Sequence, residues 1–370
     1  MLETLVNGEK MENQNLKRSL ADYPELLKAY SEVKVASGIA NLRCGFSNEE
    51  ETKSLAKACE QLSEGKLNLE LSSHLLPLSV QEVDAILNEA LLKAAPTSLS
   101  SPYLRNQDSK EVFLTAFNLM VFELLTQLGA SATRLSNALY QKAKDFGRIN
   151  KSARIALQEI SVDTLEEQFS AYADGITRLS SQLQMEAEKW NISLIGCGPV
   201  GNPEAINTQF AFLASAELSH LLRRQLVLPA DPMSLFSGPD EILMTHGLVQ
   251  SLSMKAWRIV RDLRLMCSGP RCGFGLVIMP PVAPGSSIMP GKVNPVIAEM
   301  MMTTCDRVDA NHTSITYALK SGWFEGGTQS TVYAIKFLES CTLLSRSMDV
   351  LVQKCISGLR ALPDRCAQEV

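Results

Sequence analysis

Six long stretches of this 370-residue sequence contain almost no proline or glycine. They run over roughly 112–147, 161–190, 205–228, 239–267, 296–320 and 328–357. Each is several times longer than a typical strand, and proline and glycine are the residues that most often end a helix. The stretches therefore predict long helices, which bury their apolar faces against one another in a bundle.

The first stretch has the periodicity of a helix, with large apolar side chains every three or four residues along one face. These side chains are Phe113, Phe117, Met120, Val121, Leu124 and Leu128. No alternating strand pattern of comparable strength is present, so the predicted fold is an all-α bundle. Residues 19–100 predict a smaller N-terminal region of shorter helices, with a helix start at Asp22 and Pro24.

The charge balance and hydropathy exclude two classes of partner. The chain has 35 Lys and Arg against 40 Asp and Glu, without the basic concentration that binding to a phosphate backbone requires. No apolar run approaches the roughly 20 residues that span a bilayer, and the first residues lack the pattern of a signal peptide. We therefore expect no nucleic acid and no membrane as partners, and a cytoplasmic location.

Nine cysteines and four histidines are scattered along the chain. The cysteines form no CxxC pair, and the cytosol keeps thiols reduced, so buried free thiols are expected. The histidines form no HExxH motif or other compact set of ligands. The sequence accordingly predicts no metal and no other cofactor.

One segment departs from helical patterning. Residues 280–295 read PPVAPGSSIMPGKVNP, a run of proline, glycine and small side chains between two predicted helices. Glycine permits unusual backbone conformations and proline stiffens the flanking positions, which suits a loop that closes over a ligand. Lys292 supplies a positive charge and Asn294 an amide donor for a carboxylate, while Ser286 or Ser287 can take a proton.

The sequence GSSIMPGKVNP at 285–295 resembles the signature loop of the aspartase/fumarase superfamily, which also includes argininosuccinate lyase and adenylosuccinate lyase. KAWRIVRDLRLMCSGPRCG at 255–273 is similar to the segment that leads into this loop in aspartase and fumarase. ARIALQEISVDTLEEQFSAY at 153–172 is similar to the family's GRTxLQDA segment. The resemblance implies the all-α, long-helix bundle of that family.

The resemblance also implies a mechanism for this loop. Ser286 corresponds to the general base that removes a proton from the carbon beside a carboxylate, which forms an aci-carboxylate. Loss of ammonia, water or a larger amine from the neighbouring carbon then leaves a fumarate-like product. Lys292 and Asn294 correspond to residues that hold a substrate carboxylate. Ser287 and Met289 of the same loop are further candidate substrate-binding residues.

A segment that normally lines the same pocket is altered. NQDSKEVFLTAF at 106–117 lies over the family's SQSxNDxxPTAF, so a hydroxyl-hydroxyl-amide triplet becomes Asp108, Ser109 and Lys110. Only Ser109 keeps its chemical type. Lys110 brings a new cation and Asp108 a new carboxylate, so all three are candidate residues for binding a non-standard substrate.

Two further family segments are also changed. In the GRTxLQDA segment, a threonine and a histidine or glutamine become Ile155 and Ala156, which removes two polar partners. SSHLLPLSVQEV at 72–83 is loosely similar to a GTSxNMN stretch and puts His74, another candidate substrate-binding residue, near a threonine position. Losing one preorganised donor to developing charge commonly costs on the order of 100–1,000-fold in rate, so these changes together could abolish the ancestral reaction.

Family members are usually longer, which sets the expected domain organisation. We expect an abridged N-terminal helical region at 1–104, a central bundle at 105–358 that carries the loop, and a remnant of a truncated C-terminal domain at 359–370. In the family each site is built by three subunits of a tetramer. The resemblance therefore implies a homotetramer with sites shared between subunits, and a full-length paralogue is a further possible partner.

The sequence thus predicts a lyase that acts on a small succinate-like carboxylic acid by β-elimination or the reverse addition. The leaving group could be ammonia, water or a larger amine. The alternative is a catalytically degenerate homologue, acting as a structural or regulatory subunit or as a carboxylate-binding protein. The altered polar segments favour the alternative, and the complete GSSIMPGKVNP loop favours the enzyme.

Overall fold

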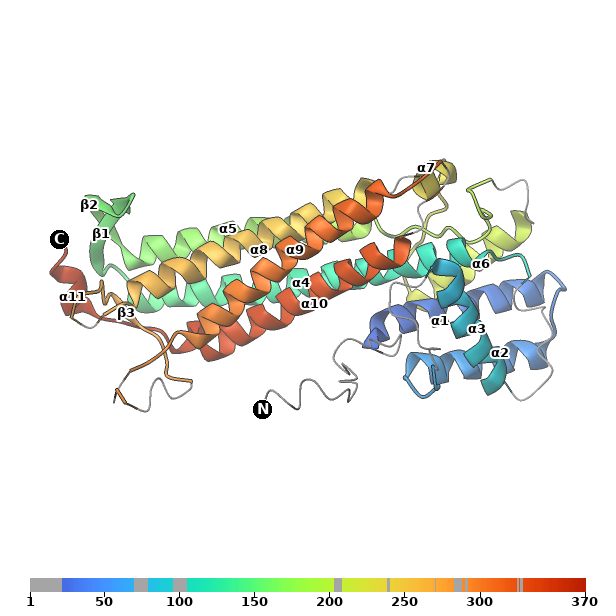
Figure 1. Cartoon of the computed structure of the whole chain (residues 1–370), viewed down its shortest axis with the longest axis horizontal. Helices are drawn as coiled ribbons and strands as arrows, with labels where there is room; N and C mark the ends of the chain where they lie inside the picture. The colour runs from blue at the N-terminus through green and yellow to red at the C-terminus, as the bar shows by residue number, and fades with distance from the viewer. Residues whose placement is uncertain are drawn as a thin grey trace, which may run out of the picture. The chain divides into compact units, whose positions relative to one another are not determined.

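The computed structural model describes residues 22–69, 79–95, 105–202, 208–237, 240–269, 271–282, 288–289, 292–324, 326 and 329–370. Long helices dominate these residues and confirm the predicted all-α class (Figure 1). By its internal contacts the chain divides into two compact units. The predicted domain boundaries near residues 104 and 358 stay predictions.

Among the described residues, the first unit contains four whole helices, nearly all of a fifth and the first residues of two more. The four whole helices are α1 (Pro24–Arg43), α2 (Glu49–Ser63), α3 (Val80–Ala94) and α6 (Thr208–Leu222). The fifth is α7 (Pro232–Ser237), whose last residue falls in the second unit. Helix α1 packs against both α2 and α6, and its start at Pro24 confirms the predicted helix start. Capping boxes begin α2 at Asn48 and α3 at Ser79, where side chains satisfy backbone N–H groups that have no partner within the helix.

The described part of the second unit is a bundle of long helices with two small two-stranded sheets. Its helices are α5 (Leu165–Glu188), α8 (Asp240–Met266), α9 (Val296–Lys320), nearly all of α10 (Ser330–Lys354) and the short α11 (Pro363–Ala367). Its strands are β1 (Asn150–Ile155), β2 (Gln158–Thr164), β3 (Val277–Ile278) and β4 (Arg360–Ala361), with a 3₁₀ turn at Ile356–Gly358. Strands β1 and β2 form one antiparallel hairpin, and β3 pairs with β4.

Helix α4 (Ser109–Phe146) contributes to both units, with its residues up to Phe117 in the first and the rest in the second. All six side chains of the predicted apolar stripe are buried. Of the described helices, α4 alone is long and apolar enough to cross a membrane, but 78% of its most apolar window is buried within the protein. It therefore has the surroundings of a core helix.

Hydroxyl pairs join α4 to its neighbours in the second unit. Ser136 Oγ lies 2.6 Å from Thr177 Oγ1 of α5, and Ser131 Oγ lies 2.7 Å from Ser345 Oγ of α10. Because buried hydroxyl groups need hydrogen-bond partners, these pairs specify which faces of the helices meet.

The sequence does not predict the β1–β2 hairpin, and its turn explains why. Ala156 and Leu157 at the turn have positive φ values of 50° and 66°. Turns of this kind are normally signalled by Asn-Gly or Asp-Gly, because few other residues adopt positive φ without strain. The hairpin also leaves Ile155, Ile160 and Val162 more than half exposed, so no alternation between buried and exposed positions marks its strands.

Gly196 and Gly45 offer a matched test of backbone geometry in the first unit. Both have positive φ, 86° and 78°. A Cβ on Gly196 would lie 2.2 Å from Ala211 Cβ of α6, whereas nothing lies within 4 Å of a Cβ on Gly45. The left-handed region costs an L-residue about 1–2 kcal/mol, and overpacking adds about 1–3 kcal/mol.

We therefore expect Gly196→Ala to lower the free energy of unfolding by about 2–5 kcal/mol and Gly45→Ala by about 1–2 kcal/mol. Urea denaturation at matched protein concentration measures both. Equal losses in the two variants would contradict the close approach of Gly196 to α6.

Candidate active site

The described part of the signature loop leads into α9 in the second unit. Lys292 N donates a hydrogen bond to Met289 O at 3.2 Å, and Val296 N donates to Asn294 O at 2.9 Å. Met289 and Lys292 are exposed and Asn294 is half-buried. Helix α9 then begins at Val296 without a side-chain cap. Ser286, Ser287 and His74 lie outside the described residues.

The altered triplet lies at the start of α4 in the first unit. Asp108 Oδ1 accepts a hydrogen bond from Lys110 N at 2.8 Å, so this carboxylate caps the helix. Lys110 Nζ donates to Phe236 O at 3.3 Å and lies 4.9 Å from the centroid of the Phe236 ring. Ser109 is half-buried beside them. The structure therefore brings the triplet together on one turn, and places the described loop residues in the other unit.

Glu111 lies in this region and was not predicted from the sequence as a functional residue. Its side chain is fully buried, and Oε1 accepts a hydrogen bond from Asp108 N at 3.1 Å. Oε2 accepts from Gly196 N at 3.1 Å and from Gly198 N at 2.7 Å. The available signal was the Asp-x-x-Glu spacing directly before an apolar run, which is a variant of the capping box.

Burial raises the pKa of Glu111 to about 7, because the charged form loses its hydration. The three backbone N–H groups act in the opposite direction, and the nearby Asp108 carboxylate adds to the increase. Glu111 is thus a buried carboxyl group that titrates near neutral pH.

The hairpin tip carries no polar group at the two altered family positions. Ile155 is 70% exposed, and Ala156 follows it at the turn. The polar partners that the family places there are therefore replaced by an exposed apolar surface.

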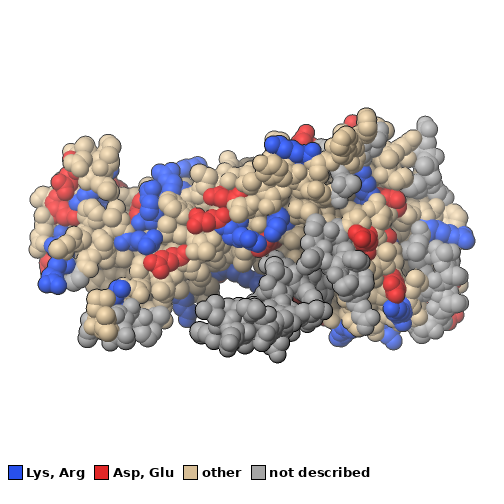
Figure 2. All heavy atoms as spheres, viewed as in Figure 1, with Lys and Arg blue, Asp and Glu red and all other residues tan. Residues whose placement is uncertain are grey.

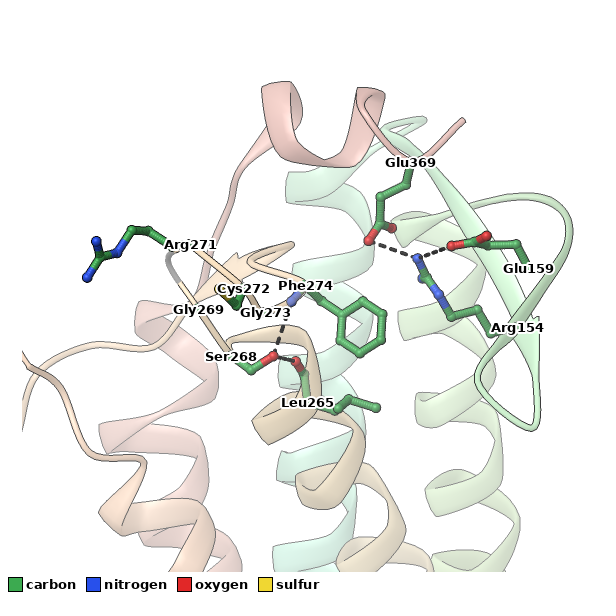
Figure 3. A pocket seen from close by; sticks show the side chains of 10 residues that line it. All are labelled: Arg154, Glu159, Leu265, Ser268, Gly269, Arg271, Cys272, Gly273, Phe274 and Glu369. Atoms are coloured by element: carbon green, nitrogen blue, oxygen red, sulfur yellow. Dashed lines mark hydrogen bonds and ion pairs between the residues drawn. The ribbon is translucent and has the colours of Figure 1, made fainter.

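A cavity of about 760 Å³ lies in the second unit between this hairpin and the Ser268–Phe274 segment (Figure 3). Arg154 lines it and forms ion pairs with Glu369 at 2.8 Å and Glu159 at 3.4 Å. Its guanidinium also lies 4.6 Å from the centroid of the Phe274 ring. Because two carboxylates neutralise Arg154 and none of the predicted site residues line this cavity, we do not assign it as the active site.

Two histidines that are far apart in the sequence meet in the second unit. His246 Nδ1 lies 3.0 Å from His312 Nδ1, and His246 Nε2 lies 2.9 Å from Ser340 Oγ. The Ser340 hydroxyl donates to Lys336 O, so His246 Nε2–H must donate to Ser340 and His246 Nδ1 must accept from His312. Burial lowers the pKa of His246 to about 3. In the described part of the chain no group of three His, Cys, Asp or Glu side chains could hold a metal ion.

Lys, Arg, Asp and Glu intermix on the face shown in Figure 2. The described surface on that face has no broad patch of a single charge. This distribution agrees with the mixed charge along the sequence.

The chain matches the lyase family over residues 7–309. It is 27% identical to aspartate ammonia-lyase of Helicobacter pylori over 361 residues, which cover 94% of this chain and 77% of the relative. It is 30% identical to class II fumarate hydratase of Bacillus subtilis over 347 residues, which cover 90% of this chain and 75% of the relative.

A solved structure gives the same fold along the whole chain. The fumarate lyase:delta crystallin of Brucella melitensis, solved bound to cobalt, superposes with a TM-score of 0.89 at 26% identity. The match covers 100% of this chain and 82% of the other. The class II fumarase of Schistosoma mansoni also shares the fold, with a TM-score of 0.88 at 21% identity and coverage of 94% and 78%.

The pKa of Glu111 predicts a specific dependence of stability on pH. In the folded protein it is about 7, above its ordinary value of 4.5, so the native state binds this proton more tightly than the unfolded state does. The stabilisation is therefore complete below about pH 4.5 and is lost as the pH rises through 7. Its size is on the order of 3 kcal/mol.

Glu111→Gln removes this titration. We expect the free energy of unfolding of the wild type, minus that of Glu111→Gln, to fall by about 3 kcal/mol between pH 4.5 and 8. Urea denaturation across that range measures the difference. A difference that does not change with pH would rule out titration of Glu111 in this range.

Proposed function

This chain belongs to the lyase family of aspartate ammonia-lyase and class II fumarate hydratase, and from this premise we propose that it eliminates ammonia, water or an amine from a succinate-like carboxylic acid. The reverse addition to a fumarate-like acid is the same chemistry. The observation that carries the proposal is the family match over residues 7–309. The complete GSSIMPGKVNP motif at 285–295 supports it.

Ser286 is the proposed general base, and Lys292 and Asn294 are the proposed ligands of the substrate carboxylate. The exposed Lys292 lies four residues before α9, a helix that begins without a side-chain cap. The partial positive charge at a helix start favours an anion, so this position suits a carboxylate. Ser287 and Met289 are proposed to contact the substrate from the same loop, and His74 from a separate segment.

Lys110 is proposed to recognise a second anionic group of the substrate, with Ser109 beside it. The Asp108 carboxylate accepts a hydrogen bond from the Lys110 backbone N–H and so caps α4. We therefore propose that Asp108 contributes less to substrate binding than Lys110 does. A cation in place of the neutral amide of the family pattern is the reason to propose a non-standard substrate.

We further propose a homotetramer whose subunits share sites, in a cytoplasmic setting. The reason is the family pattern together with the exposed apolar hairpin surface at Ile155, Ile160 and Val162. Such surfaces mark contacts with other chains. A full-length paralogue is the alternative partner that could cover this hairpin surface.

A second candidate function has one observation in its favour. The apolar hairpin tip at Ile155 and Ala156 replaces two polar partners of the family pattern. A homologue that binds a carboxylate, or that serves as a structural or regulatory subunit, would need neither partner.

Ser286→Ala separates these functions. For a lyase we expect turnover to fall by at least about 100-fold, because general base catalysis contributes about 100–10,000-fold. The measurement is absorbance near 240 nm with fumarate, aspartate, malate, argininosuccinate and adenylosuccinate in turn. The oligomeric state of both proteins is verified first by light scattering.

Activity that survives Ser286→Ala would remove Ser286 from the mechanism. The carboxylate-binding alternative would be favoured if an intact oligomer turned over none of the five compounds but bound fumarate or succinate in calorimetry. Silence without binding would favour the structural or regulatory subunit.

Lys110→Glu tests the second cation. Hydrogen bonds to charged groups contribute about 1.5–3 kcal/mol, so we expect the dissociation constant of the bound dicarboxylate to rise by about 10- to 100-fold. Calorimetry with fumarate or succinate measures it. Lys57→Glu on α2 makes the same charge change at an exposed position and should leave the constant unchanged. An equal effect in both variants would contradict a specific role for Lys110.

A further inference from the structure

We propose that Glu111 is a positioning residue for the segment Asp108–Lys110. Its buried carboxylate clamps a glycine nest, residues 196–198, onto the first turn of α4, and the clamp fixes the position of the Lys110 ammonium. The inference rests on the proposed function only for the task of Lys110 in binding substrate. The clamp itself can be tested without any substrate.

The nest has the backbone geometry of an anion-binding loop. Gly196 and Gly198 have φ values of 86° and 75°, whereas Cys197 between them is not in the positive-φ region. This alternation directs neighbouring N–H groups towards one point, which in other proteins holds a phosphate or another anion. Here that point is Glu111 Oε2, at 3.1 Å from Gly196 N and 2.7 Å from Gly198 N.

A second anchor lies one helical turn further along α4. Leu194 N donates a hydrogen bond to Thr115 Oγ1 at 2.9 Å. The loop is therefore fastened to α4 at positions 111 and 115, which lie on the same face of a helix. Of these two anchors, Glu111 alone also holds the backbone of Asp108.

The nest is connected to Lys110 through α7. A Cβ on Gly201 would lie 2.6 Å from Met233 N, so the chain just after the nest runs against the start of α7. At the other end of α7, Phe236 offers both its carbonyl oxygen and its ring to Lys110 Nζ. Glu111 thus helps to fix the position of Lys110 in two ways. It holds the backbone of Asp108 in the first turn of α4, and it holds the loop that packs against α7.

Few charges oppose or balance Glu111 among the described residues. Asp108 repels its charged form. Lys34 of α1 is attracted to Glu111, but its Nζ is already engaged by Gln107 Oε1 at 3.2 Å and Asp84 Oδ1 at 3.5 Å. Burial raises the pKa of the Cys197 thiol to about 11, so Cys197 is neutral. The carboxylate therefore depends mainly on its three backbone N–H donors.

Protonation weakens this clamp. A carboxylate has only acceptor sites, whereas a neutral carboxyl group carries an O–H that must itself donate. At least one of the three N–H groups then loses its acceptor. The clamp should consequently tighten as the pH rises through 7, while the contribution of Glu111 to global stability falls over the same range. A residue that is merely buried would not produce these opposite trends.

Amide hydrogen exchange tests the clamp directly in the full chain. We expect the protection factors of Asp108, Gly196 and Gly198 to rise by about tenfold between pH 5.5 and 8.5, the gain of a charge-assisted hydrogen bond. In Glu111→Gln the protection factors should not change with pH. Glu217→Gln is the matched control, because Glu217 is a buried glutamate of the same unit that pairs with Arg43 at 2.6 Å. This variant should keep the wild-type trend.

Acylation of Lys110, followed by mass spectrometry, tests the consequence for the ammonium. We expect Glu111→Gln to raise the rate several-fold relative to the exposed Lys57 in the same sample, and Glu217→Gln to leave the ratio unchanged. Wild-type protection factors that do not vary with pH would overturn the clamp. This measurement uses only the wild-type protein, so it does not depend on whether a variant folds. An unchanged Lys110 rate in Glu111→Gln would overturn the positioning role. Neither result depends on turnover, so a failed lyase assay remains a separate outcome.

Discussion

Burial of α4 along its whole length is the constraint on which the rest of the structure depends. The first residues of this 38-residue helix belong to one unit, and the rest of it runs through the other. Its apolar stripe faces inward and its hydroxyl side chains find partners on α5 and α10. Because a helix of this length gains most of its stability from packing, the neighbouring helices are needed along all of it.

The long helices could be predicted from the sequence because they depend on a local property, the absence of residues that end a helix. The predicted stretch 296–320 coincides with α9, and 112–147 differs from α4 by a few residues at each end. The β1–β2 hairpin could not be predicted, since Ala156 and Leu157 adopt a conformation that their residue types do not signal. Glu111 was missed for a different reason, because two of its three hydrogen-bond donors are backbone groups more than 80 residues away.

The two candidate segments use helix starts in contrasting ways. At the start of α4, the backbone N–H groups of Lys110 and Asp108 already donate to the side chains of Asp108 and Glu111. At the start of α9, Pro295 offers no side-chain cap. The backbone at the start of α9 is therefore better placed to interact with an external anion than the backbone at the start of α4. This contrast is the reason we propose different roles for the two segments, with Lys292 and Asn294 as ligands of a carboxylate and Lys110 as a residue that recognises a second anionic group.

The continuity of α4 also restricts how the length of the chain can change. One residue inserted into the helix after Gly129 would rotate everything beyond it by about 100°. Ser131 and Ser136 would then turn away from Ser345 and Thr177, and the buried Leu135 and Leu139 would leave the core with them. A substitution affects one contact, but an insertion or deletion would displace all later contacts at once. Gains and losses of residues can therefore be accommodated in the connecting segments and not within this helix.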